Sequence, residues 1–183
     1  METAISSTTA FSGRIVSVRV DEVETPSGRR ATREVVERPD TVSVLAVDDK
    51  GRVLFVRQYR YAVGRETLEI PAGTIDPGET PEEAARRELR EETGYDCEEL
   101  EPLITYYPAA GYSTEKMTIY LAKKLVPAPL VGDEESIKAE AVATEEACRI
   151  LTEQPLVGAD RGSVFHDGKT IIALLLAHSR GLL

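Results

Sequence analysis

A strongly marked helix at about residues 81–93 constrains the fold of this chain more than any other feature of its sequence. Thr80 is a good N-cap, and Glu83 at the third helical position completes a capping box with it. Pro81 fits the first helical position, where its missing N–H costs nothing. Gly94 suits the left-handed conformation that commonly ends a helix. The sequence therefore predicts a helix with defined ends and a known register.

One face of this helix concentrates negative charge. Glu88 and Glu92 are four residues apart and stack on the same face, and Glu91 borders that face. Arg86 and Arg90 point roughly the other way, so we expect the acids to lack a matching base on the helix. Carboxylates crowded in this way repel each other unless a cation lies between them. Carboxylate oxygens are ligands that Mg²⁺ prefers, and bound ions would also bridge to a phosphate ligand.

The charge pattern alone also fits a solvated structural helix, because Glu83–Arg87 and Arg87–Glu91 are favourable i,i+4 pairs. The segment before the helix argues against that interpretation. A strand ending in Pro71-Ala72-Gly73 delivers the chain to a tight loop that leads into the helix. A backbone carbonyl of this segment can then join the carboxylates as a ligand, so the sequence favours metal-assisted phosphate chemistry.

Segments with strand-like alternation flank the helix, in a chain of a length that suits one domain. Residues 1–12 are expected to be a loose end, and 26–28 and 48–51 to be turns. Residues 143–153 are typical of a short helix and 169–179 of a closing helix. Strands are predicted at 13–23, 30–38, 42–47, 52–57, 99–107 and 115–123. Mixed strands with few helices predict an α+β fold or a helix–sheet–helix sandwich.

The charge balance excludes several classes of partner. Acidic residues outnumber basic ones 32 to 22, for a formal net charge of -10. Such a chain is poorly suited to bind nucleic acid or an anionic membrane through charge. Cys97 and Cys148 match neither a zinc spacing nor a disulfide framework. The first residues hold no apolar signal segment, and the longest apolar run, 171–177, is too short to cross a bilayer, so we expect a cytoplasmic protein.

The segment around the helix resembles the Nudix box in full, as Gly73-x5-Glu79-x7-Arg87-Glu88-Leu89-Arg90-Glu91-Glu92-Thr93-Gly94-Tyr95. Further segments resemble the ADP-ribose pyrophosphatase branch of that family. They are Arg33–Glu37, Val56–Tyr61, Glu69–Gly73 and Tyr107–Glu115, so the resemblance covers roughly residues 13–180. One position departs from the branch, since Ala110 stands where a proline is usual.

The resemblance implies a Nudix-type α/β/α sandwich, a mixed sheet between helices, with an N-terminal antiparallel strand layer. It divides the chain into an N-terminal strand region, 1–40, and a Nudix hydrolase domain, 41–183. Two strands alone are barely stable and leave edges exposed. Because the branch pairs such strands between two copies, we expect a homodimer.

The resemblance also implies the metal ligands. Glu88 and Glu92 would be the main ligands of Mg²⁺, with Mn²⁺ as an alternative ion, and the carbonyl of Ala72 would be a third. Glu91 would be a ligand or would orient one. Glu79 and Arg87 would pair to fix the loop to the helix, and Gly73 would let the loop turn tightly against it.

The family usually draws its general base from an acidic loop after the sheet, here residues 131–137. We assign the base to Glu135, with Glu134 as the second candidate. The alternative is a solvated acidic turn without a catalytic role.

Five residues match positions that bind substrate in the branch. Arg60 matches a phosphate contact, although a surface arginine at a strand end is the alternative. Gly111 and Glu115 match a loop near the terminal ribose. Arg33 and Glu34 match positions that reach the substrate of the partner subunit, with an exposed strand as the alternative.

The function implied is Mg²⁺-dependent hydrolysis of ADP-ribose to AMP and ribose 5-phosphate. Another nucleoside diphosphate sugar, such as GDP-mannose, is the second candidate, because the metal-binding helix would recognise only the pyrophosphate of the substrate. A third is a sensor that binds ADP-ribose without turnover. Sensors tend to lose acidic residues of the box, whereas Glu88, Glu91 and Glu92 are all present here.

Overall fold

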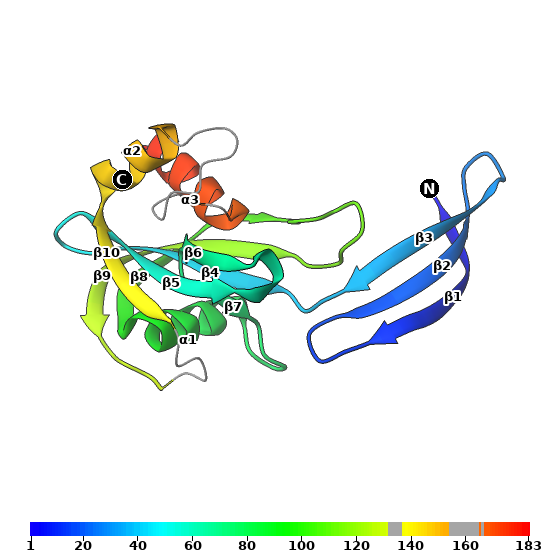
Figure 1. The fold of residues 1–183 in the computed structure, drawn as a ribbon, viewed down its shortest axis with the longest axis horizontal. Helices are drawn as coiled ribbons and strands as arrows, with labels where there is room; N and C mark the ends of the chain where they lie inside the picture. The colour runs from blue at the N-terminus through cyan, green and yellow to red at the C-terminus, as the bar shows by residue number, and fades with distance from the viewer. Residues whose placement is uncertain (132–136, 154–164, 166) are drawn as a thin grey trace. The chain divides into compact units, whose positions relative to one another are not determined.

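The computed structural model describes residues 1–131, 137–153, 165 and 167–183 (Figure 1). Contacts divide the chain into two compact units. The first contains residues 1–40 and 106–117, and the second contains residues 41–105 and 118–183.

The first unit holds a three-stranded antiparallel sheet in the order β1-β2-β3. Its strands are β1 (Thr3–Ser12), β2 (Ser17–Glu24) and β3 (Arg30–Glu37). The expected strands at 13–23 and 30–38 are confirmed as β2 and β3, and Gly28 has the positive φ, 76°, of a turn residue. The expectation that residues 1–12 are a loose end is wrong, because β1 pairs with β2 from Thr3 to Ser12. Every residue of β1 is exposed, so the strand does not need the alternation of apolar and polar residues by which a half-buried strand is predicted from sequence.

The loop of residues 107–116 belongs to the same unit and is tied to the end of β3. Val36 donates its N–H to the carbonyl of Tyr112 at 2.7 Å, and Thr114 donates to the carbonyl of Val36 at 3.0 Å. Arg38 also pairs with Glu115 at 3.2 Å. These bonds fix the loop against the strand.

The second unit is built on a seven-stranded sheet in the order β10-β5-β4-β9-β8, with β6 paired to β5 and β7 paired to β4. Its elements are β4 (Thr41–Val47), β5 (Arg52–Arg60), a 3-10 turn η1 (Tyr61–Val63), β6 (Arg65–Glu69), β7 (Ala72–Thr74), β8 (Tyr95–Tyr106), β9 (Met117–Pro127) and β10 (Lys138–Ala143). The loop of residues 107–116, which belongs to the first unit, connects β8 to β9 in the sequence.

In the described ranges, three helices cover this sheet: α1 (Pro81–Thr93), α2 (Thr144–Glu153) and α3 (Gly168–Ser179). Helix α1 lies on one face, and α2 and α3 lie on the other (Figure 1). The predicted class, a mixed sheet between helices with an antiparallel N-terminal strand layer, is confirmed. In the described part of the chain, no helix has the length and apolar character needed to span a membrane.

The core lies on both faces of the central strands. Val42, Val44 and Ala46 of β4 pack with Ala84 and Leu89 of α1. Successive side chains of a strand point to opposite faces, so the rest of β4 faces α3, and it is buried almost throughout. This packing holds α1 and α3 against the sheet.

Candidate functional site

The limits of α1 match the sequence prediction, and they set which residues turn inward. Thr80 accepts a hydrogen bond from the N–H of Glu83, whose side chain accepts one from the N–H of Thr80, so the capping box is present. Gly94 ends the helix in the left-handed conformation, with φ 80°. In this register Ala84, Ala85, Leu89 and Glu88 are buried, so one carboxylate of the acidic face is packed inside the protein.

Glu88 lies directly against the backbone of β7. A Cβ atom added at Gly73 would come within 1.9 Å of Oε1 of Glu88, which is far inside contact distance. Only a glycine therefore lets the strand approach the carboxylate this closely. Burial raises the pKa of Glu88, although the neighbouring Arg87 lowers it.

Glu92 is half-buried one turn further along the same face, and it is joined to the same segment. Its Oε2 accepts a hydrogen bond from the N–H of Ala72 at 3.0 Å. Burial raises the pKa of Glu92 to about 8, and the charge of Glu88 adds to the effect. The raised pKa means that burial outweighs the nearby positive charges, so a bound cation would further stabilise the charged form of Glu92.

Arg87 is the cation of this acidic face. It donates from Nη1 to Glu88 at 2.6 Å and lies 3.4 Å from Glu91. The expectation that the acids lack a base on their own helix is therefore wrong for Glu88 and Glu91, because the long side chain of Arg87 curls back over the face. As predicted, Arg87 also pairs with Glu79, at 2.9 Å from both Nε and Nη2, and so ties the loop to the helix.

Another buried carboxylate, that of Glu69, lies just before the Ala72–Gly73 segment in the sequence, and the residue is only 2% exposed. Although burial raises its pKa, Arg60, Lys169 and Thr67 together lower it to about 2. Arg60 donates from Nε and Nη2 to the two carboxylate oxygens, at 2.9 and 2.7 Å. The two cations also stabilise the charged form of Glu92.

The remaining predicted site residues fall into different parts of the chain. Arg60 ends β5 in the second unit, with Ala72, Glu88, Glu91 and Glu92. In the first unit lie Arg33 and Glu34, both exposed on β3, and Gly111 and Glu115 of the 107–116 loop.

Within the first unit, Arg33 and Glu115 form ion pairs with residues of opposite charge. Arg33 donates from Nε to Glu2 at 3.0 Å, and Glu115 pairs with Arg38. Glu134 and Glu135, the two candidates for the base, lie outside the residues that the structure describes.

The sequence analysis missed Glu69, Lys169 and Thr170 as parts of this site. Thr170 accepts a hydrogen bond from the N–H of Ile70 at 2.9 Å, and Lys169 donates to Glu69. The available signal was a charged pair, Asp167 and Lys169, at the start of an otherwise apolar helix.

The oxygen donors of the site fit a hard divalent cation. Glu88 and Glu92 present carboxylates on one face, where Glu88 lies against Gly73 and Glu92 accepts from the N–H of Ala72. Carboxylate and backbone carbonyl oxygens are ligands that such a cation prefers. Among the described residues, no three His, Cys, Asp or Glu side chains already converge as a metal cage. A ligand set of two carboxylates with a backbone carbonyl needs no such cage.

Models of two known domains match the chain. The one described as NUDIX domain matches residues 37–164, and the one described as nucleoside diphosphate sugar hydrolase N-terminal domain matches residues 2–36.

Curated and solved proteins are similar along most of the chain. The methanol dehydrogenase activator of Bacillus methanolicus is 35% identical, over 94% of this chain and 90% of its own. The ADP-ribose pyrophosphatase of Bacillus subtilis (strain 168) is 34% identical with the same coverage. A crystal structure of an ADP compounds hydrolase superposes with a TM-score of 0.85 at 27% identity, over 99% of this chain and 95% of that one.

Proposed function

The chain belongs to the Nudix family, and from that premise we propose that it hydrolyses the pyrophosphate of ADP-ribose, releasing AMP and ribose 5-phosphate. It is a hydrolase of this family, which generally needs a divalent metal ion. The observation that carries the proposal is the close approach of Glu88 to Gly73 together with the hydrogen bond from Ala72 to Glu92. The name of the Bacillus subtilis relative supports the choice of ADP-ribose.

We propose Mg²⁺ as the ion, with Mn²⁺ as the alternative. Glu88, Glu92 and the carbonyl of Ala72 would hold it, and Glu91 would be a ligand or orient one. When bound, the ion neutralises phosphate oxygens and lowers the pKa of a water molecule. Oxygen donors of these kinds suit both ions.

The protein's own residues supply position and proton transfer in this proposal. The bond from Ala72 N–H to Glu92 holds the carboxylate beside the loop, and Arg87 holds Glu88. Glu69 accepts hydrogen bonds from two nitrogens of Arg60 and so orients the guanidinium group. We propose that this guanidinium contacts a substrate phosphate.

The general base would take the proton of the attacking water, and such a base adds roughly 10²–10⁴-fold to a rate. We propose Glu135 for this role, with Glu134 as the second candidate. The water oxygen bonds to one phosphorus, and the bond from that phosphorus to the bridging oxygen breaks. The electron pair of that bond leaves with the other phosphate.

The first unit would complete the substrate site as part of a homodimer. We propose that residues 1–40 form a strand region that pairs with a second copy. Arg33 and Glu34 would then contact the substrate of the partner subunit, and Gly111 and Glu115 would lie near the terminal ribose. The match of residues 2–36 to the N-terminal domain of nucleoside diphosphate sugar hydrolases supports this division.

A second candidate substrate is another nucleoside diphosphate sugar, such as GDP-mannose. The same N-terminal match favours this broader class, because its description names nucleoside diphosphate sugars without naming the base.

A turnover panel tests the proposal. ADP-ribose, GDP-mannose, NADH and a dinucleoside polyphosphate are offered to the enzyme with Mg²⁺ and with a chelator, and phosphorus NMR follows the products. We expect ADP-ribose to give AMP and ribose 5-phosphate only when Mg²⁺ is present. Preferred cleavage of GDP-mannose would move the assignment to the second candidate. No turnover of any member would reject the proposal, as would the same rate for Glu92→Gln.

A further inference from the structure

We propose that the first turn of α3 positions the metal-binding segment, with Lys169 and Thr170 as the positioning residues. They hold Glu69 and Ile70, and through these residues they fix Ala72 against α1. This inference rests on the proposed function, because it assigns a role toward the same metal site.

The first contact joins Thr170 to the backbone of Ile70. The N–H of Ile70 donates to Oγ1 of Thr170 at 2.9 Å, across 100 residues of sequence. Both residues are fully buried, so water cannot easily replace this hydroxyl if it is removed. A buried N–H without a partner is costly, and the segment would have to move to satisfy it.

The second contact is a buried ion pair. Lys169 is 9% exposed and donates to Glu69, which is 2% exposed, and it also donates to Asp167 at 2.9 Å. Asp167 in turn caps α3 by accepting from the N–H of Thr170 at 3.0 Å. A buried ion pair is favourable only in a well-formed geometry, so this network sets where the helix start lies relative to Glu69.

Only Pro71 separates Ile70 from Ala72, so the position of Ile70 is passed on directly. The proline ring fixes one backbone angle, and the carbonyl of Pro71 accepts from the N–H of Val44 at 2.9 Å. Ala72 then donates to Glu92. Two hydrogen bonds, joined by the backbone of residues 70–72, therefore connect the first turn of α3 to a proposed metal ligand on α1.

Docking of α3 alone does not require these polar contacts. Ala173, Leu174 and Ala177 are fully buried and already hold the helix on the sheet. Apolar packing is non-directional, whereas the hydrogen bonds of Thr170 and Lys169 specify one alignment. We therefore expect their loss to weaken metal binding more than it weakens the fold.

The test replaces Thr170 by valine, which keeps the branched shape and removes the acceptor. Electron paramagnetic resonance measures the affinity of Mn²⁺ for the full chain without substrate. Because loss of a group that orients metal ligands weakens binding about 10–100-fold, we expect Thr170→Val to weaken Mn²⁺ binding about tenfold. The value of kcat at limiting Mg²⁺ should fall, and added Mg²⁺ should restore it, while KM for ADP-ribose at saturating Mg²⁺ changes little.

Two controls separate positioning from stability. Thr170→Ser keeps the hydroxyl and should bind Mn²⁺ like the wild type. Thr152→Val makes the same change on α2, where the threonine donates to carbonyls of its own helix, and should also bind Mn²⁺ like the wild type. Lys169→Met, compared with the exposed Lys124→Met, repeats the test for the ion pair. If Lys169→Met does not fold, the Thr170 series decides.

Wild-type Mn²⁺ affinity in Thr170→Val would overturn this inference and leave the proposed function standing. Equal weakening in Thr170→Val and Thr152→Val would overturn it too, because the effect would not be specific to the contact with Ile70. Absence of Mn²⁺ binding by the wild type would instead reject the proposed metal site itself.

Discussion

Two neighbouring glutamates show how environment decides the state of a carboxylate. Glu69 is surrounded by Arg60, Lys169 and Thr67, and its pKa is lowered to about 2. Glu92 is half-buried beside Glu88, and the loss of solvation raises its pKa to about 8. The negative charge of Glu69 is therefore already stabilised by its protein partners, whereas a bound cation would further stabilise the charged form of Glu92. This contrast separates a residue that organises the site from one that binds within it.

The raised pKa of Glu92 makes the metal-free protein sensitive to pH. Between its ordinary value of 4.5 and about 8, folded Glu92 holds more protons than the unfolded chain does. The free energy of unfolding therefore falls as the pH rises through this window. Glu92→Gln removes that loss, so we expect the variant to be more stable than the wild type at pH 8 by about 1 kcal/mol or more.

Urea denaturation in the presence of a chelator, at several values between pH 5 and 8, measures this effect. The gap between Glu92→Gln and the wild type should widen with rising pH. A gap that stays constant across the range would contradict the assignment of a raised pKa to Glu92. The same variant should have lost its metal-dependent turnover, so it would gain stability while losing function.

At the residue scale, the sequence predicts which side chains share the acidic face of α1, but it does not predict partners that are distant in sequence. Glu88 and Glu92 follow from spacing on a single helix, and the pair of Glu79 with Arg87 follows from the box. The contact of Lys169 with Glu69 joins residues 100 apart, and local periodicity carries no information about it. The reach of Arg87 back to Glu88 depends on a side-chain conformation that helix geometry leaves open.

Elements with strong local signals were predicted well. Helix α1 begins and ends as its caps indicate, because a capping box and a terminal glycine act within a few residues. Helices α2 and α3 were predicted to within a residue at either end. Strand β1 was missed, because a fully exposed strand has no apolar alternation. Its structure comes from pairing with β2, which is a property of the sheet rather than of the segment.

The packing of β7 against α1 supports a second prediction. A Cβ atom at Gly73 would collide with the carboxylate of Glu88, so Gly73→Ala must displace that side chain or the strand. Misplacement of a catalytic group by about 1 Å costs about 10²-fold in rate. We therefore expect kcat to fall about 100-fold in Gly73→Ala, with the protein still folded by circular dichroism.

Gly168→Ala is the matched control, because a Cβ added at Gly168 meets nothing within 4 Å and its φ is not positive. This variant should keep wild-type turnover. If Gly73→Ala also turned over at the wild-type rate, the close approach of strand and carboxylate would have no catalytic importance.

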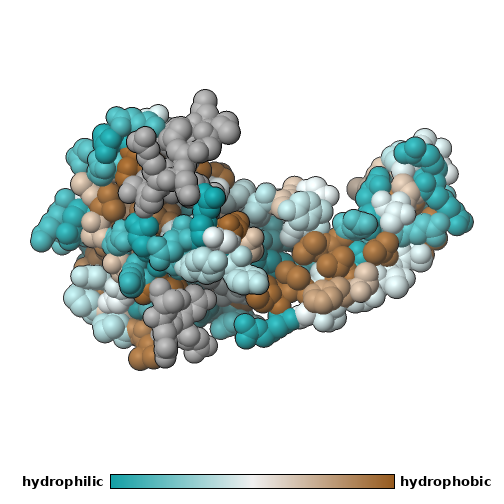
Figure 2. All heavy atoms as spheres, viewed as in Figure 1, coloured by the Kyte–Doolittle hydropathy of each residue, from teal (hydrophilic) through white to brown (hydrophobic). Residues whose placement is uncertain are grey.

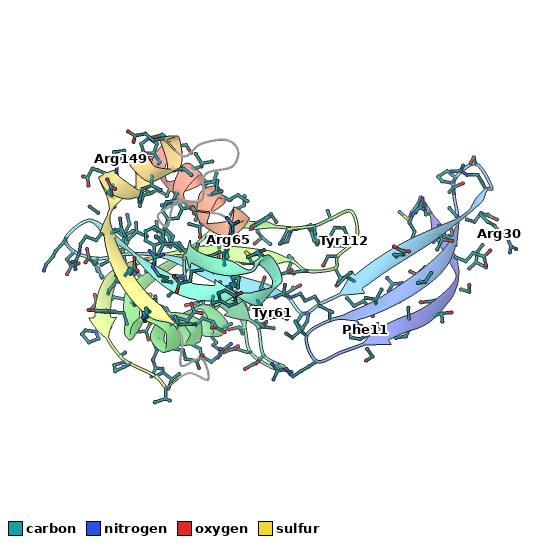
Figure 3. All side chains as sticks on the ribbon, in the orientation of Figure 1. Phe11, Arg30, Tyr61, Arg65, Tyr112 and Arg149 are labelled. Carbon is teal, nitrogen blue, oxygen red and sulfur yellow. The ribbon has the colours of Figure 1, made fainter. Side chains whose placement is uncertain are left out.

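At the scale of the whole molecule, a single chain leaves one strand of the three-stranded sheet exposed along its whole length. All of β1 is exposed at the edge of this sheet, including Phe11 (Figure 3). Ile5 of the same strand and Ile15 in the turn after it are exposed as well. Figure 2 shows hydrophobic residues gathered on the visible face of the same sheet. An unpaired edge and exposed apolar side chains favour pairing with another chain.

We therefore expect a homodimer in solution. Size-exclusion chromatography with light scattering should give twice the mass of 20.1 kDa that one chain has. Phe11→Asp should shift the protein toward the monomer, because it would bury a charge at the interface. A monomeric wild type would contradict the dimer and, with it, the role of Arg33 and Glu34 toward the partner's substrate.

The account as a whole depends on a divalent ion held between α1 and the segment before it. A crystal grown with Mn²⁺ and a non-hydrolysable analogue of ADP-ribose tests this directly through anomalous scattering. We expect a peak bound by Glu88, Glu92 and the carbonyl of Ala72, in contact with the pyrophosphate of the analogue. A peak elsewhere, with Glu88 and Glu92 free of metal beside the bound analogue, would contradict the account.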